Sequence, residues 1–227
     1  MLAIAGEPVA IHVRFHPRAR RMVMRVHPLS GEVTVTAPVR TSLASALAFA
    51  RGEVGWIARQ RKQMPPAIAF VPGTIVPFGG APHQIRHSAV KGPAPVWRDG
   101  DQILVSGKLE HARRRLADFF KREAKRALET RALEYGALLG VRPSRVVVRD
   151  TASRWGSCSS SRSLSFSWRL IFAPAFVRDY VVAHEVAHLK EMNHSPRFWA
   201  HVKTLSPDTD RARQWLRDHG RNLLRYN

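Results

Sequence analysis

The sequence contains a single cysteine, Cys158, so no disulfide can form within the chain, and a disulfide-stabilised scaffold is excluded. It also lacks any run of about 18 consecutive apolar residues, and we therefore predict no transmembrane helix. The segment 1–10 has neither the basic start nor the long apolar stretch of a secretory signal. From these absences we expect a cytoplasmic protein that is not bound to a membrane.

Acidic residues are scarce. The chain of 227 residues carries 37 Lys and Arg against 17 Asp and Glu, which gives a net charge of +20. A basic surface attracts nucleic acid, acidic proteins or anionic lipid, although an Arg-rich composition can also follow from the host genome. Nucleic acid is therefore a candidate partner. The hydrophobic content of 44% suffices for one large domain or two small ones.

The first part of the chain is rich in strand patterns. Alternating apolar residues predict strands over 9–15, 22–26 and 33–35, with a turn at 28–31. A helix is expected to start at Thr41 or Ser42 and to end before Pro65. Its predicted buried stripe is Leu43, Leu47, Ala50, Val54 and Ile57. Residues 67–107 again resemble strands separated by Gly and Pro turns. Residues 1–107 are thus predicted to be a β-rich region with one helix.

The pattern changes near Lys108. Residues 108–138 predict a long charged helix closed by Gly140, followed by short strands at 146–148 and 163–170. Proline at 174, at 196 and at 207 stands where a helix can begin. We therefore expect an α+β fold in which residues 108–227 form a separate catalytic domain.

The most informative motif is His184-Glu185-Val186-Ala187-His188. Two histidines four positions apart lie on one face of a helix, so both imidazoles can reach a single ion. With the adjacent Glu185 they form the HExxH arrangement of zinc hydrolases, which are usually peptidases.

A catalytic zinc takes three protein ligands and leaves a position for water. His194 is the expected third ligand, provided that the helix stops before it. Asn193 favours such a stop because asparagine tolerates a left-handed backbone. Three carboxylates are alternatives. Glu191 lies too far along the helix axis to share the ion easily, and Asp208 and Asp210 follow downstream.

The motif also predicts a reaction. Zinc lowers the pKa of a bound water towards about 7 and polarises a carbonyl, and Glu185 is placed to act as general base. An oxyanion would need a further partner, for which Tyr180 and Arg154 are candidates. Cys158 is interpreted as structural, since no base for a thiol nucleophile is evident. The strand at 163–170 could accept an extended peptide along its edge, or it could be an internal strand of a sheet.

Four segments around these residues carry a family resemblance: 151–159, 170–174, 179–189 and 193–199. Through them the chain resembles the YgjP-like metallopeptidases, which are related to SprT-like zinc proteases. Weaker similarity extends upstream to 19–22, 36–38 and 56–57. The resemblance implies a zincin-like domain with His184, His188 and His194 as zinc ligands and Glu185 as the catalytic residue.

One position departs from a related pattern. Metzincins share the three-histidine spacing but have glycine where this chain has Glu191, so a metzincin turn is not expected. SprT-like proteases act on proteins bound to DNA. Together with the basic surface, this resemblance suggests a proteolytic role associated with nucleic acid.

The function predicted from the sequence is therefore a cytoplasmic zinc metallopeptidase acting on a protein or peptide. Two alternatives remain open at this point. YbeY-like zinc endoribonucleases use three histidines at the same spacing but lack the glutamate present here as Glu185. A nucleic-acid-binding protein with a structural zinc would need a fourth ligand, which only Cys158 could supply as a cysteine. The substrate and the oligomeric state are not predicted.

Overall fold

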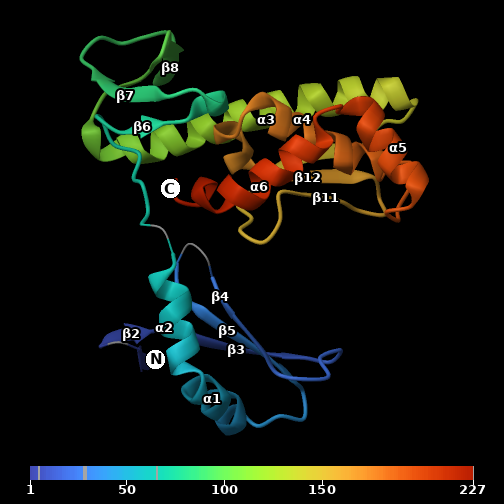
Figure 1. Ribbon diagram of the computed structural model, residues 1–227. Helices are drawn as coiled ribbons and strands as arrows, with labels where there is room; N and C mark the ends of the chain where they lie inside the picture. The colour runs from blue at the N-terminus through green and yellow to red at the C-terminus, as the bar shows by residue number, and fades with distance from the viewer. Residues whose placement is uncertain (5, 28–29, 65, 227) are drawn as a thin grey trace. The chain divides into compact units, whose positions relative to one another are not determined.

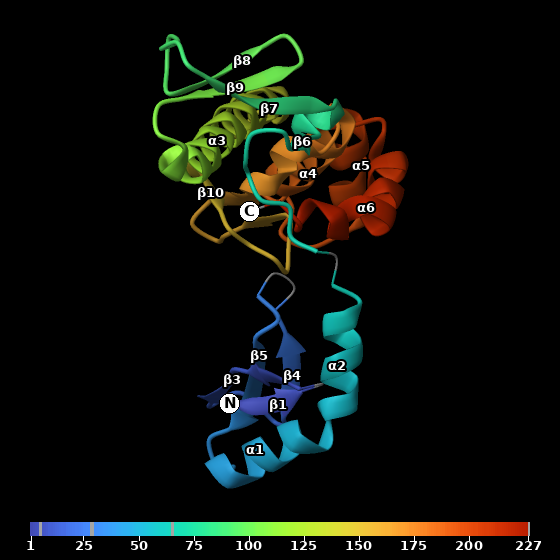
Figure 2. The ribbon, with the colours of Figure 1, turned by 90° about the vertical axis from the view of Figure 1, so that its left-hand side faces the viewer.

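The computed structural model describes residues 1–4, 6–27, 30–64 and 66–226 and divides the chain into two compact units, Met1–Pro66 and Ala67–Asn227. Figures 1 and 2 show that each unit has its own helices and sheets. The predicted turn at 28–31 includes Pro28 and Leu29, which lie outside the described residues.

The first unit contains short strands followed by two consecutive helices. Its elements are β1 (Leu2–Ile4), β2 (Glu7–Val9), β3 (Ile11–His16), β4 (Val23–Val26), β5 (Val33–Pro38), α1 (Leu43–Gly52) and α2 (Val54–Lys62). The strand β5 lies between β3, which is parallel to it, and β4, which is antiparallel. Val33 and Val35 of β5 are fully buried, so this central strand supplies the core of the unit.

The helical part of this unit was predicted correctly at its start but not in its middle. The Ser42 side chain accepts a hydrogen bond from the Ser45 N–H, as a helix cap does. Glu53 leaves the helical conformation and separates α1 from α2, so the single predicted helix is wrong. Of the predicted stripe, Ala50 and Ile57 are buried, whereas Leu43 at the first position of α1 is 55% exposed.

The second unit combines two small sheets with one long helix and three shorter ones. Its elements are β6 (Ile75–Val76), η1 (Phe78–Gly80), β7 (His83–Ser88), β8 (Val96–Asp99), β9 (Gln102–Ser106), η2 (Leu109–His111), α3 (Ala112–Leu139), β10 (Arg145–Arg149), β11 (Gly156–Cys158), β12 (Ser163–Ser167), η3 (Trp168–Phe172), α4 (Ala175–Ala187), α5 (Pro196–Leu205) and α6 (Thr209–Leu223). The α+β class is confirmed, and the long helix ends at Gly140 in the left-handed conformation, as predicted.

The structure divides the chain at Pro66, not near Lys108 where the sequence analysis placed the boundary. Strands β6–β9 share one hydrophobic core with α3: Ile85 and Ile103 belong to the same buried cluster as Leu116 and Phe120. The change of composition near Lys108 therefore marks the passage from a sheet to the helix that covers it. It does not mark the end of a compact unit.

The helix α4 lies beside α3, α5 and α6 (Figures 1 and 2), and its side chains enter the same core. On its other side stands the sheet β10–β12–β11, in which β12 is central. The predicted strand at 163–170 ends at Ser167, because the backbone then turns through η3. Arg169, expected on a polar face, is 1% exposed, and its guanidinium donates to the Tyr226 carbonyl and pairs with Asp150.

Candidate metal centre

The first two histidines of the motif lie at the end of α4. His184 and Glu185 belong to its last turn, and His188 is the residue that follows its final helical position. Both imidazoles therefore stand on one side of the helix end, with their ring centroids 5.0 Å apart. The four-residue spacing produces the juxtaposition that was predicted from it.

The chain then turns back through residues 188–195 and begins α5 at Pro196. The expected role of Asn193 is wrong: the helix already ends at Ala187, and among the described residues Arg162 is the only one other than glycine with a positive φ. The side-chain Oδ1 of Asn193 instead accepts a hydrogen bond from the Ser195 N–H, which tightens the turn. Ser195 caps α5 through the Phe198 N–H, as the sequence predicted.

This turn brings His194 against the first two histidines. Its Nε2 lies 3.2 Å from the Nε2 of His184, and its ring centroid lies 4.8 Å from that of His188. One ligand atom from each of the three side chains lies within 4.8 Å of the other two. Phe198, fully buried in α5, contacts all three rings at centroid distances of 4.5–4.9 Å and forms the floor beneath them.

The donor set fits a divalent ion. Zinc ligands about 2.0–2.1 Å from the ion in a tetrahedron stand roughly 3.3 Å apart, close to the separation of the His184 and His194 nitrogens. The Nδ1 of His188 lies 3.0 Å from the Glu191 carbonyl oxygen; a proton on Nδ1 donated there leaves Nε2 free as a ligand. Burial, and then the neighbouring histidines and Arg213, lower the pKa of His184 to about 4, so its imidazole is neutral, as a ligand must be.

The carboxylates considered as alternatives do not join this cluster. Glu191 contributes its backbone carbonyl to His188, whereas Asp208 and Asp210 pair with Arg211 and Arg213 at 3.7 Å. Cys158 does not join the ligand group either, within the part of the chain that the structure describes. Its pKa is raised, first by burial and then by the charge of Glu185, which keeps it a thiol. A closed four-ligand structural site is therefore not supported.

Glu185 is the most deeply buried acid near the histidines. It is 6% exposed, and burial raises its pKa to about 7, although the positive charge of Arg154 acts in the opposite direction. A carboxyl group with a pKa near neutrality can both accept and release a proton at physiological pH, as a general base that later acts as an acid requires.

The two candidates for stabilising an oxyanion have different neighbours in the cluster. Tyr180, one turn before His184 on α4, has its ring centroid 6.0 Å from that of His184. Arg154 is exposed in the loop before β11, and its charge acts on Glu185. Each of these two side chains is near the cluster, and neither has another evident catalytic partner. Both therefore remain predicted oxyanion donors.

The strand that runs beside Glu185 is β11, which the sequence analysis did not single out. A Cβ on Gly156 would come within 2.5 Å of a Glu185 carboxylate oxygen, so only glycine leaves room for this carboxyl group. The strand β12, expected to offer an edge, pairs with β10 on one side and β11 on the other and has no edge available. Among the described strands of this sheet, β11 is the edge strand closest to the motif, and the order of a sheet cannot be read from local sequence.

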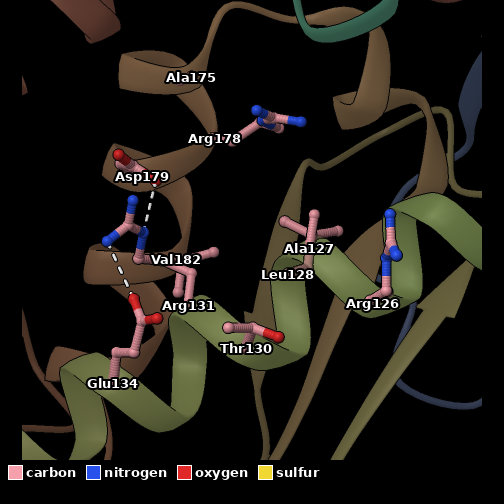
Figure 3. Close-up of a pocket in the computed structure, with 10 residues that line it drawn as sticks. All are labelled: Arg126, Ala127, Leu128, Thr130, Arg131, Glu134, Ala175, Arg178, Asp179 and Val182. Atoms are coloured by element: carbon pink, nitrogen blue, oxygen red, sulfur yellow. Dashed lines mark hydrogen bonds and ion pairs between the residues drawn. The ribbon is translucent and has the colours of Figure 1, made fainter.

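The opposite face of α4 is fastened to α3. Arg178 and Val182 lie about 200° around the helix from Tyr180 and His184, and they line a cavity between the two helices (Figure 3). In this cavity the Arg131 Nε donates to Asp179 at 3.0 Å, and an Arg131 Nη donates to Glu134 at 2.9 Å. The pair between Arg131 and Asp179 therefore holds the helix that carries His184 and Glu185 against the long helix.

The sequence model of the YgjP-like family, described as a metallopeptidase domain, matches residues 20–219. A search of curated proteins found no match. Among solved structures, the metallopeptidase zymogen abylysin from Pyrococcus abyssi is similar at 22% identity and a TM-score of 0.37, covering 44% of this chain and 97% of the abylysin chain. No helix among the described residues is long and apolar enough to cross a membrane.

Proposed function

Because this chain belongs to the YgjP-like metallopeptidase family, we propose that it is a zinc-dependent peptidase in which His184, His188 and His194 hold the ion and Glu185 is the general base. The observation that carries this proposal is the convergence of three imidazoles beside a buried carboxyl group of raised pKa. The single cysteine favours a cytoplasmic location.

A bound zinc ion would supply a Lewis acid for the scissile carbonyl and lower the pKa of a coordinated water. The chain's own residues perform the proton transfers. The Glu185 carboxylate accepts a proton from the attacking water and then delivers it to the amine that leaves as the peptide bond breaks. Burial of Glu185 favours the uptake of the proton from the water, since its protonated form is the one that burial stabilises.

The substrate carbonyl develops negative charge during this reaction, and a nearby donor stabilises it. The phenol of Tyr180 and the guanidinium of Arg154 are the two groups available for this role. Replacement of Tyr180 by Phe and of Arg154 by Gln separates them: the variant that lowers kcat by about 100-fold identifies the donor.

We further propose that the peptide binds in an extended conformation along β11. Backbone groups on the free edge of this strand can pair with a substrate strand, and Gly156 leaves Glu185 room beside it. This places the substrate on β11 and not on the internal strand β12, where the sequence analysis had considered it.

The test is metal analysis combined with a proteolysis assay on the wild type and on Glu185→Gln. We expect both proteins to bind one zinc ion per chain and the variant to lose cleavage by at least about 100-fold. A His201→Ala variant is the matched control, since His201 lies outside the cluster of three histidines. If Glu185→Gln retains both zinc and full activity, the assignment of the base is wrong.

A further inference from the structure

One face of α6 carries a row of arginines. Arg213, Arg217 and Arg221 stand at intervals of four residues in the helix Thr209–Leu223, so their side chains share one side of it. The helix α6 packs against α4, the helix whose last turn carries His184 (Figures 1 and 2). The row therefore begins beside the histidine cluster and leads away from it.

The contacts of Arg213 place the first arginine of the row beside the histidine cluster. The Arg213 guanidinium lies 5.0 Å from the ring of Trp199, whose ring centroid is 5.9 Å from that of His194. Burial raises the pKa of Tyr180, and the positive charges of Arg213 and Arg217 act against this rise. Two of the arginines are thus electrostatic neighbours of Tyr180, one turn from His184.

The row ends in a hollow of about 240 Å³ between α6 and the loop that precedes β11. Three arginines line it: Arg217 and Arg221 from α6 and Arg154 from the loop. Its wall is held in place by close packing, since a Cβ on Gly220 would lie 3.2 Å from the ring of Trp155.

Within the described part of the chain, the arginines of this hollow form no ion pair, although Arg154 acts electrostatically on Glu185 and an Arg217 Nη donates to the Gln214 amide oxygen. Among the described residues, no carboxylate oxygen lies within 4.0 Å of the guanidinium nitrogens of Arg154, Arg217 or Arg221. The nearest acid along the helix, Asp218, is bonded to the Gln214 amide at 2.9 Å. Two arginines of α3 differ, because Arg126 pairs with Glu123 and Arg131 with Asp179.

The hollow directly precedes, along the chain, the strand that is proposed to bind the substrate. Trp155 lines the hollow and is followed directly by Gly156, the residue of β11 that lies against Glu185. A peptide that follows β11 past Glu185 consequently reaches Arg154 and Arg221 with its next residues. Guanidinium groups bind carboxylates through paired hydrogen bonds.

We propose that the hollow formed by Arg154, Arg217 and Arg221 binds carboxylate side chains of the substrate, so that the enzyme selects peptides with Asp or Glu on one side of the cleaved bond. This inference rests on the proposed peptidase function and names its substrate class. Exposed ion pairs are weak, so two of them favour an acidic peptide over its amide twin by about fivefold.

The experiment uses the full-length, zinc-loaded Glu185→Gln protein and two fluorescein-labelled peptides. Both share an apolar core, flanked in one by Asp and Glu and in the other by Asn and Gln. Fluorescence anisotropy gives Kd for each peptide with this protein and with the same protein carrying Arg217→Gln and Arg221→Gln. Arg211→Gln is the matched control, because Arg211 lies on the same helix over the ring of Phe176, outside the hollow.

We expect the acidic peptide to bind about fivefold more tightly, the double replacement to remove this preference, and Arg211→Gln to retain it. Arg217→Lys with Arg221→Lys keeps the charge and should retain most of the preference. Equal binding of the two peptides, or a preference that survives the double replacement, overturns the inference. So does a 12-nucleotide RNA that binds more tightly than the acidic peptide and loses more affinity on the double replacement.

Cleavage of the same peptides by protein with Glu185 intact separates this inference from the function on which it rests. A fivefold preference in kcat/KM for the acidic peptide supports both. A preference in binding without cleavage of either peptide supports the arginine-lined hollow and contradicts the peptidase. Cleavage of both peptides at equal rates contradicts the hollow and supports the peptidase.

Discussion

The carboxyl group of Glu185 lies directly against the backbone of Gly156, at a distance that leaves no space for a Cβ on that residue. Replacing Gly156 by Ala would bring the new Cβ to 2.5 Å from Oε1 and 2.6 Å from Cγ of Glu185. Because Glu185 is buried, its side chain must move from its position beside the histidines. We expect Gly156→Ala to lower kcat by about 10- to 100-fold, a cost typical of a displacement of about 1 Å at a reacting group.

The control is Gly52→Ala, since a Cβ on Gly52 meets nothing within 4 Å. Zinc content, measured alongside kcat, should be unchanged in both variants. Full activity of Gly156→Ala would show that the position of Glu185 does not depend on this glycine.

Glu185 also makes the stability of the metal-free protein depend on pH. Its pKa is about 7 when folded and 4.5 as the ordinary value, so the folded state binds more protons between these limits. Stability from this group is thus fully present below pH 4.5 and is lost as the pH rises through 7. A shift of this size corresponds to about 3 kcal/mol.

Glu185→Gln removes the group that titrates. We expect the metal-free variant to unfold at a higher temperature than the metal-free wild type at pH 8 and at a similar temperature at pH 5. Thermal unfolding of both proteins at both pH values measures the difference. An identical difference at pH 5 and pH 8 would mean that Glu185 keeps its ordinary pKa in the fold.

The ligand assignment separates His194 from Glu191. Glu191 acts on His188 through its backbone carbonyl, which a side-chain replacement leaves in place. We expect Glu191→Ala to keep its zinc affinity within about twofold. His194→Ala should lose more than about 100-fold in zinc affinity. Even the loss of a residue that only hydrogen-bonds to a ligand lowers metal affinity by about 10- to 100-fold. Competition with a zinc chelator measures both; a larger loss for Glu191→Ala would reverse the assignment.

The bond between Arg131 and Asp179 predicts a change in stability that does not depend on the metal. Both side chains are partly exposed, so we expect Asp179→Asn to lower the free energy of unfolding by about 1 kcal/mol. The comparison is Asp118→Asn, which removes the more exposed i,i+4 pair with Arg114 and should cost less than about 0.5 kcal/mol. Urea unfolding measures both losses of stability. If the two losses are equal, the ion pair between α3 and α4 stabilises the fold no more than the exposed pair within α3 does.

Local sequence predicted the parts of the site that depend on local geometry. The spacing of His184 and His188 follows from the helix repeat, and the start of α5 follows from the cap at Ser195. The class of fold, the long helix closed by Gly140 and the family resemblance were also confirmed. In each case neighbouring residues along the chain carry the physical cause.

The parts that sequence did not predict arise from contacts between distant segments. Gly156 and Glu185 meet only because β11 pairs with β12 and stands beside α4. The alternation that suggested an exposed strand at 163–170 hid a buried arginine, Arg169, whose charge is satisfied by Asp150 and the Tyr226 carbonyl. Likewise, no local signal shows that residues 67–107 form a sheet on α3. The sequence analysis did not single out the arginines of α6, because the hollow that they line forms only where α6 meets the loop before β11.

The three histidines all come from residues 184–194, a short stretch of one chain. An ion that ties together such close neighbours restricts the unfolded polypeptide only slightly, because the entropy of closing a loop grows with its length. Metal binding therefore adds little to the stability of the fold. Phe198 anchors this segment in the core whether or not the ion is bound. Loss and recovery of the ion can then proceed without unfolding, so a chelated sample should regain activity simply on addition of zinc.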